Sequence, residues 1–336
     1  MRGGYVVRRL GVAMATILAI VLFNFVLFRL MPGSPERILF RGIPNVSEER
    51  LDAARARWGL DDPILPIVID DAGIRFEAEN QFFKYLVATA QGDLGFSFVA
   101  RGQEVANVLA QRLWPTLLLF GLGEAIAIVV GLALGAYSGW RRGGLVDFLG
   151  NGASLFLYAT PYFLLGMVLV LLGAAVGLPT FGMLTAGASY PDVWARLTDL
   201  FAHLLLPVAT VALGLIGQYA IVMRSSIVET ISEDYVTTAR AMGLREGRIL
   251  GAHAVPNALL PTVSLIAINL GYVIAGAVTV EVVFNWPGLG TLTVEALGSR
   301  DYPVLQGVFL LLSITVVLAN LLADLVYGLL DPRVRT

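Results

Sequence analysis

The sequence of 336 residues is strongly apolar, with 57% hydrophobic and only 14% charged residues. A soluble domain needs more surface charge than this, so much of the chain is expected to lie in lipid. The formal net charge of −2 and the lack of basic tracts give no indication of nucleic-acid binding. The absence of cysteine excludes disulfides, thiol nucleophiles and thiolate metal sites.

The first predicted element is a membrane-spanning helix at about 10–31, within a segment 1–31 that begins with Arg2, Arg8 and Arg9. A cleaved signal peptide is the alternative. Its apolar core would be about half as long, and a site of small residues would follow it. Neither condition is met, so we expect a retained span.

Residues 32–114 are expected to form an external loop, because they are amphipathic rather than apolar. Ser47 can cap a short helix that Gly59 would end. Residues 66–79 alternate around a central Asp-Ala-Gly turn and predict a β-hairpin. Two interpretations of the loop remain open, which are a lid over the spans and a docking surface for an external protein.

The remaining 115–336 are expected to form a five-helix core, since a bilayer needs about 20 apolar residues per helix. The third span of the chain is long enough to tilt or to break near Pro161. Arginines concentrate in the loops that would share one side with both termini, so the positive-inside rule places the termini in the cytoplasm. The predicted fold class is an all-α membrane protein with six transmembrane helices. The core spans are predicted at about 115–138, 146–176, 203–223, 259–281 and 304–328.

The long connection at about 224–258 is expected on the cytoplasmic side. Thr230 and Glu233 match a capping box, in which the two side chains satisfy free backbone amides reciprocally. A helix of about twelve residues would follow and end at Gly243. A second short helix is predicted from about Arg245, ending at Pro256.

The first of these helices places Tyr235, Ala239 and Met242 on one face at helical spacing. The small side chains of Ala239 and Ala241 would leave room for a close partner. The pattern therefore predicts a rigid, capped helix with an exposed contact surface.

The stretch from Glu233 to Leu244 resembles the EAA loop of ABC-importer permeases. Thr237 and Thr238 stand where the general signature has glutamate and its first alanine. The variant Tyr-x-x-Thr-Ala-Arg-Ala-x-Gly is similar to that of the dipeptide/oligopeptide/nickel branch. The residues that match the loop, and that the resemblance implies contact an ATPase, are Glu233, Asp234, Tyr235, Thr238, Ala239, Arg240, Gly243, His253 and Pro256.

Segments elsewhere resemble the same branch, in the same order, over nearly the whole chain. Any one of them is a weak signal, whereas the ordered set is specific. They are Gly92-Asp93-Leu94-Gly95 with Ser97, Pro115-Thr116, Glu281-Val282-Val283-Phe284, Pro287-Gly288-Leu289-Gly290, Asp301-Tyr302-Pro303, Asp324 with Tyr327, and Asp331-Pro332-Arg333.

The resemblance implies a type I ABC-importer permease fold in the bacterial cytoplasmic (inner) membrane. It implies a heterodimer with a second homologous permease subunit, two ABC ATPase subunits and an extracytoplasmic substrate-binding protein. ATP and Mg²⁺ would be bound by the ATPases, and no cofactor is expected on this chain. The implied substrates are di- and oligopeptides, with nickel complexes or another small solute as the alternative.

Two other classes of function are less well supported. A Walker A loop needs a lysine followed by Ser or Thr, and the single lysine, Lys84, precedes a tyrosine. His203 and His253 are predicted on opposite sides of the membrane, so no metal site is expected. No serine lies in a nucleophile motif of an intramembrane protease. A secondary transporter or channel is expected to have broken helices with paired charges at the membrane midplane, often in repeated halves. The sequence does not show these features.

Polar side chains within the predicted spans are costly and are therefore candidates for function. Hydrogen bonding between helices is the other interpretation of each of them. Arg224 and Asp324 lie near a helix end, where either could be solvated or paired. The full set comprises Asn24, Glu124, Gln218, Tyr219, Asn269, Tyr272, Asn320 and Asp324. Spans four and five flank the EAA loop, so we expect Gln218, Tyr219, Asn269 and Tyr272 to line the substrate pathway.

Overall fold

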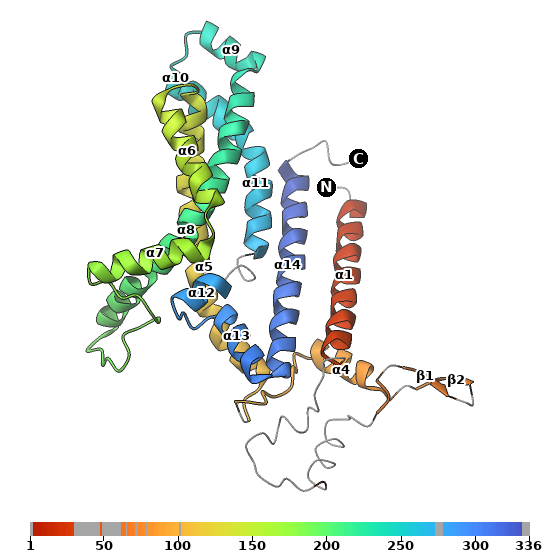
Figure 1. Cartoon of the computed structure of the whole chain (residues 1–336). Coiled ribbons are helices and arrows are strands. Elements are labelled where there is room, and N and C mark those ends of the chain that lie inside the picture. The colour runs from red at the N-terminus through yellow and green to blue at the C-terminus, as the bar shows by residue number, and fades with distance from the viewer. Residues whose placement is uncertain are drawn as a thin grey trace. The chain divides into compact units, whose positions relative to one another are not determined.

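The computed structural model describes residues 3–29, 48, 62–64, 66–70, 73–77, 79–100, 102–272 and 278–330 (Figure 1). The described residues form two compact units. The larger unit draws on Met1–Leu10, Leu113–Thr291 and Thr315–Thr336, and the smaller on Gly11–Arg112 and Leu292–Ile314. The predicted division at 31 and 114 therefore does not coincide with the compact units, and it stays a prediction.

The larger unit is built of helices, two of which are joined by a π-helical segment. Its elements are most of α5 (Val105–Trp140), α6 (Leu145–Ala159), α7 (Tyr162–Ala175), α8 (Val193–Ile231), α9 (Asp234–Ala241), α10 (Glu246–Ile249), the π-helix η1 (Leu250–Ala254), α11 (Val255–Tyr272), α12 (Val278–Val283) and the second half of α14 (Tyr302–Leu330). The smaller unit holds most of α1 (Gly3–Arg29), β1 (Ile67–Asp70), β2 (Gly73–Phe76), α4 (Gln81–Ala90) and most of α13 (Leu289–Ser299).

Five helices of the described chain are long and apolar enough to cross a membrane, and a bent pair of helices can supply a sixth crossing. These six segments confirm the predicted fold class. Helix α5 begins ten residues before the predicted second span, and α8 extends beyond the predicted fourth span at both ends. Of the predicted fifth span, α11 accounts for the part up to Tyr272, and residues 273–277 lie outside the described chain.

The third span breaks where the sequence predicts. Thr160 has ψ 124° and Pro161 has ψ 139°, so both have left the helical region. The proline ring disfavours helical geometry at the preceding residue, which ends α6. Helices α6 and α7 meet at 104° (Figure 1).

Glycines on α5 allow its backbone to lie directly against α8. A Cβ atom at Gly131 would lie 2.7 Å from the Cβ of Tyr219. One at Gly135 would lie 2.4 Å from the Ala220 carbonyl oxygen, and one at Gly139 would lie 2.9 Å from the Arg224 carbonyl oxygen. Small residues at every fourth position are typical of helices that associate in lipid.

Helix α8 meets α6 and α7 through its own glycines. A Cβ at Gly217 would lie 2.4 Å from the Ser154 carbonyl oxygen of α6. A Cβ at Gly214 would lie 2.2 Å from the ring of Tyr162 in the first turn of α7. Helix α8 is therefore packed closely on two sides, and its buried face extends from His203 to Thr230.

The smaller unit contains the predicted β-hairpin. Strands β1 and β2 pair antiparallel, with Ile67 opposite Phe76 and Asp70 opposite Gly73. Asn80 caps α4 by accepting a hydrogen bond from the Phe83 amide at 2.9 Å. Of the helix predicted after Ser47, only Glu48 lies within the described residues, and it is helical.

Four hydrogen bonds contribute to holding the smaller unit together. Asn24 of α1 donates to the Tyr85 hydroxyl and to the Gln306 carbonyl at 3.2 and 3.1 Å. The buried Asp301 carboxylate accepts a 2.5 Å hydrogen bond from Ser97, so it fixes the Gly92–Ser97 segment at the start of α14. Lys84 donates to Asp62 at 2.6 Å, and this hydrogen bond raises the pKa of Lys84.

We expect Gly135→Val to destabilise the detergent-solubilised chain, because its Cβ would overlap a carbonyl oxygen that a rigid helix cannot move. Overpacking of this kind costs about 1–3 kcal/mol. Gly121→Val is the matched control, since no atom lies within 4 Å of a Cβ built there. Thermal unfolding should separate the two variants, and equal midpoints would contradict the close α5–α8 contact.

Candidate functional site

In the predicted coupling loop, residues 224–258, the first helix begins about one helical turn later than the capping box suggests. Helix α8 continues through Thr230 to Ile231, and the side chain of Thr230 is buried. Glu233 is the N-cap of α9 and makes no side-chain capping bond. The capping-box prediction is therefore wrong. An N-cap residue needs a non-helical, usually extended backbone. Thr230 cannot be an N-cap because burial of α8 against its neighbours keeps this residue helical.

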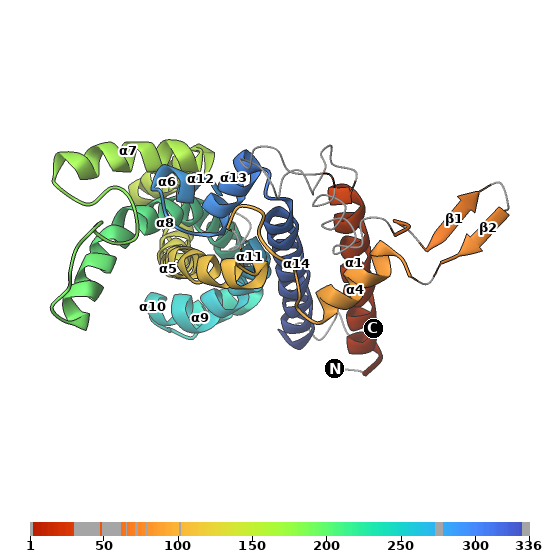
Figure 2. The ribbon, with the colours of Figure 1, turned by 90° about the horizontal axis from the view of Figure 1, so that it is seen from below.

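Helix α9 packs against α10, the next helix of the chain (Figure 2). Val236 and Ala239 are buried against Ile249 of α10, and Trp140 and Leu244 cover the edge of this cluster. Ala239 retains only 2% of its exposure, whereas Tyr235 retains 39% and Met242 68%. The three therefore do not form one exposed contact surface, and the space beside Ala239 is filled by this chain rather than by a partner. Ala241 is exposed, as expected.

Arg240 supports the same packing from outside. Its Nε lies 3.1 Å from a Glu246 carboxylate oxygen, and its guanidinium lies 5.3 Å from the centre of the Trp140 ring. Both charged side chains are about half exposed, so solvent screens the pair and its contribution is small. The contact orients α9 relative to α10 and the end of α5.

Gly243 ends α9 as predicted. Its φ of +74° lies in the left-handed region that side chains with a Cβ disfavour. The Gly243 amide donates to the Arg240 carbonyl at 2.9 Å, and the Leu244 amide donates to the Ala239 carbonyl at 3.2 Å. These two bonds form a Schellman motif, which turns the chain sharply toward α10.

The second predicted helix does not stop at Pro256. The chain passes from α10 through η1 into α11, and Pro256 lies in the first turn of α11. A π-helical turn shifts the hydrogen-bond register, so the missing amide of proline can be tolerated within a continuous helical path. His253 is half-buried, and its carbonyl accepts a 2.8 Å hydrogen bond from Asn257. The predicted stop is wrong, and the loop is joined rigidly to α11.

The outer surface of the loop is polar with two apolar protrusions. Tyr235 and Met242 are the exposed large apolar side chains in it. The other sequence-predicted contact residues that are exposed are Glu233, Asp234, Thr238, Arg240, Gly243 and Pro256. The arrangement offers a short, internally packed surface for a partner.

The predicted pathway residues meet in a polar network between α5, α8 and α11. The Asn269 amide donates to the Gln218 side-chain oxygen at 3.3 Å and to the Tyr219 hydroxyl at 3.0 Å. The Tyr219 hydroxyl donates to the buried carboxylate of Glu124. Tyr219 is fully buried, whereas Gln218 and Asn269 are partly exposed. The side chain of Tyr272 lies outside the described part of the chain.

Arg224 and Asp324, which the sequence leaves as either solvated or paired, both form ion pairs. Arg224 pairs with Asp147 of α6 at 2.5 Å, and Asp324 pairs with Arg9 of α1 at 2.5 Å. The Tyr5 hydroxyl also donates to the Asp324 carbonyl at 3.2 Å. The ends of α1 and α14 therefore lie together. Sequence reasoning missed Asp147, which stands far from Arg224 in the chain.

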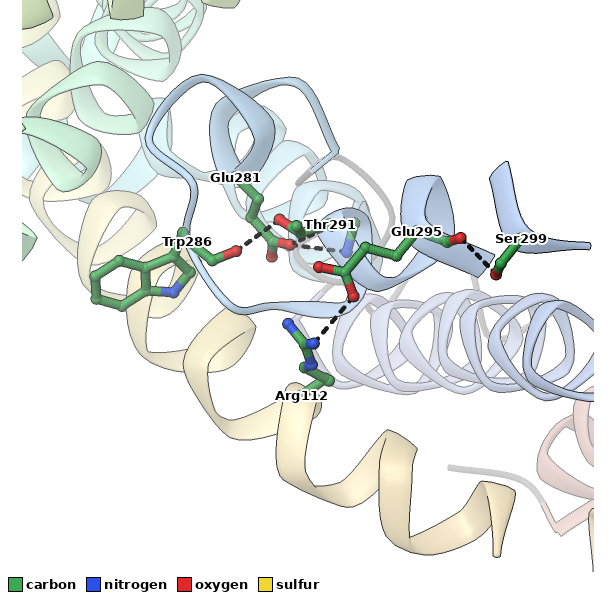
Figure 3. Close-up of polar contacts among 7 residues, drawn as sticks. Arg112, Glu281, Trp286, Thr291, Glu295 and Ser299 are labelled. Atoms are coloured by element: carbon green, nitrogen blue, oxygen red, sulfur yellow. Dashed lines mark hydrogen bonds and ion pairs between the residues drawn. The ribbon is translucent and has the colours of Figure 1, made fainter. Parts of the chain in front are cut away.

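A buried carboxylate organises the segment that contains α12. Glu281 accepts hydrogen bonds from the Thr116 hydroxyl at 2.6 Å and from the Gly290 and Thr291 amides at 2.8 and 3.0 Å. The Thr291 hydroxyl donates to the Trp286 carbonyl at 2.6 Å (Figure 3). In the smaller unit, Arg112 pairs with Glu295 at 3.0 Å.

The loop between α7 and α8 is held by Asp199. This carboxylate accepts hydrogen bonds from the Thr185 amide at 2.7 Å and from the Tyr190 hydroxyl at 2.6 Å. The bond to Asp199 raises the pKa of Tyr190. The His203 ring lies 2.9 Å from the Asp199 carbonyl. Among the described residues, no group of three or more potential ligands could hold a metal ion.

Residues 128–336, which include the whole coupling loop, match the family described as binding-protein-dependent transport system inner membrane component. The chain belongs to this family. The family is one of inner-membrane transport components rather than enzymes, and its description names a binding protein as part of the system.

Relatives align with the chain along its full length. The dipeptide transport system permease protein DppB of Escherichia coli is 34% identical over 351 residues, covering 98% of each chain. The oligopeptide transport system permease protein AppB of Bacillus subtilis is 31% identical over 332 residues, again with 98% coverage of each. A structure of the inward-facing MetNI methionine ABC transporter covers 67% of this chain and 96% of its own, with a TM-score of 0.54 at 18% identity. This likeness supports the permease fold.

In this permease we expect Ile249→Ala to loosen the coupling loop, because the substitution uncovers Val236 and Ala239. Loss of a buried aliphatic side chain costs about 2–5 kcal/mol. Limited trypsin digestion should then cleave faster at the exposed Arg245 and Arg248. Met242→Ala serves as the control, since Met242 is 68% exposed. Equal cleavage of the two variants would contradict the packed loop.

Proposed function

We propose that this permease is the membrane subunit of an ATP-driven ABC importer for di- and oligopeptides, and that its coupling loop is pushed by partner ATPases. The observation that carries the proposal is the construction of the loop. Its first helix is seated on the second by a buried cluster, is closed by a Schellman motif at Gly243, and exposes Tyr235 and Met242. A rigid, exposed helix can receive force and pass it to α8 and α11.

The proposed assembly contains a second, homologous permease subunit, two ABC ATPase subunits and an extracytoplasmic substrate-binding protein. ATP and Mg²⁺ are bound by the ATPases in this proposal. The positive-inside pattern of arginines supports a cytoplasmic position for the loop and for both termini. The contact of Arg9 with Asp324 agrees with termini on one side.

Peptide is the proposed substrate because relatives that align over the whole chain are named as dipeptide and oligopeptide permeases. Nickel complexes and other small solutes are the alternative. The external binding protein is expected to select the ligand. Titration of that protein with dipeptides, longer peptides and Ni²⁺ distinguishes these substrates.

The substrate pathway is proposed to pass Gln218 and Asn269, the partly exposed members of the polar network. Tyr219 is buried, so its proposed task is to hold Asn269 in place through their 3.0 Å hydrogen bond. Tyr272 stays a predicted member of the pathway.

The loop assignment predicts a contact that can be trapped chemically. The chain has no cysteine, so Met242→Cys introduces a single thiol. In membranes that contain the whole transporter, a photo-crosslinker attached to this thiol should link it to an ATPase subunit on illumination. Phe156→Cys on α6 is the matched control, because Phe156 is also 68% exposed. Equal linking at both sites, or none at Met242, would refute the assignment. The purified chain alone should hydrolyse no ATP.

The pathway assignment predicts that Gln218→Ala and Asn269→Ala each lower peptide uptake by about fivefold or more, the loss expected for one hydrogen bond of about 1 kcal/mol. Co-purification with the ATPases should persist. Asn320→Ala provides the control, since Asn320 lies on α14 outside the network. Uptake at the control level in both variants would remove the two residues from the pathway.

A further inference from the structure

A partly buried ion pair joins α6 to α8 at the start of the coupling loop. Arg224 donates from Nε to one Asp147 oxygen at 2.5 Å and from Nη2 to the other at 2.8 Å. The Gly143 amide donates to the second oxygen at 3.0 Å. The Asp147 side chain is only 8% exposed. Both carboxylate oxygens are therefore engaged in a two-pronged contact of fixed orientation.

The pair links the part of α8 that leads into α9 to the first turn of the bent helix pair. Arg224 precedes the end of α8 at Ile231 by about two helical turns. Asp147 is in the first turn of α6, and the far end of α6 is the 104° bend into α7. A displacement that enters α8 from α9 thus meets Arg224 before it can reach α6.

The other contacts between α8 and the bent pair are of a different kind. Gly217 lies against the backbone of α6 around Ser154, and Gly214 lies under the Tyr162 ring. Close packing of this kind fixes how near two helices lie and resists sliding, but it is not directional. A hydrogen bond weakens steeply with misalignment, so a slip of one residue, about 1.5 Å, would break the two-pronged pair.

Contacts continue from the bent pair to α12. A Cβ at Gly166 of α7 would lie 3.2 Å from Val283 and 3.3 Å from Phe284, at the end of α12. Glu281 of α12 is in turn bonded to Thr116 of α5. Elements in direct contact therefore lead from the coupling loop through α8, α6 and α7 to the segment that Glu281 organises.

We propose that Asp147 and Arg224 are positioning residues that make α6 and α7 follow α8 when the coupling loop is displaced. The proposal rests on the proposed function of the loop. Without the pair, α8 moves and the bent helices lag behind, so ATP hydrolysis continues while less substrate crosses. A pair that served stability alone would lower the amount of protein but leave the ratio of ATP to substrate unchanged.

The first test measures ATP hydrolysed per peptide imported by the complete transporter in liposomes, with its binding protein present. Arg224→Gln and Asp147→Asn should each raise this ratio by about fivefold or more, a typical coupling effect. Arg224→Lys keeps the charge but loses the fork, so it should give an intermediate ratio. Asp324→Asn is the matched control, because it removes a 2.5 Å Arg–Asp contact that involves neither α6 nor α8.

The second test follows the helices directly. Spin labels at Phe156→Cys on α6 and Glu229→Cys on α8 report their separation in a chain that has no native cysteine. With Asp147 and Arg224 unchanged, the two labels should give the same distance distribution with and without trapped ATP. The Arg224→Gln background should give a second distribution when ATP is trapped.

An unchanged ATP-to-peptide ratio in Arg224→Gln and Asp147→Asn, or a single distance distribution in the Arg224→Gln background, would overturn the proposal. If these variants fail to accumulate, Arg224→Lys serves as the test. An unchanged ratio of ATP to peptide in Arg224→Lys would then overturn the proposal. Failure of the proposed function is seen separately, as the absence of linking between Met242→Cys and an ATPase in the otherwise unchanged chain.

Discussion

Contact between the backbones of α5 and α8 is the constraint on which the larger unit depends. In lipid there is little hydrophobic force between helices, so close packing and hydrogen bonds must hold them together. Gly131, Gly135 and Gly139 lie at every fourth position of α5, and each leaves room for α8 where a methyl group would collide. The result is a stiff two-helix support, and α9 of the coupling loop follows directly after the end of α8.

Polar groups add what glycine packing lacks. Glu124 bonds to Tyr219, and Arg224 bonds to Asp147, so α8 is fixed to α5 and to α6 at separate points along its length. Each of these groups would be costly in a bilayer without its partner. Glycines therefore bring the helices close together, and the polar pairs add directional bonds between them.

The sequence predicts much of this architecture because hydrophobic length and glycine chemistry act locally. It identifies six spans, the break at Pro161 and the left-handed turn at Gly243. It fails where packing overrides local preference, since burial keeps Thr230 helical and a π-helical turn carries the chain past Pro256. The inward orientation of Ala239 and the partner of Arg224 depend on residues distant in sequence, which periodicity cannot reveal.

The coupling loop is attached at both ends to helices that are tied to each other. The loop continues without a break into α11, and Asn269 of α11 bonds to Tyr219 of α8. A force on the exposed face near Met242 therefore cannot part the two helices without breaking the hydrogen bond between Asn269 and Tyr219. Between α8 and the bent helix pair, Asp147 and Arg224 add a directional tie to the close packing at Gly214 and Gly217.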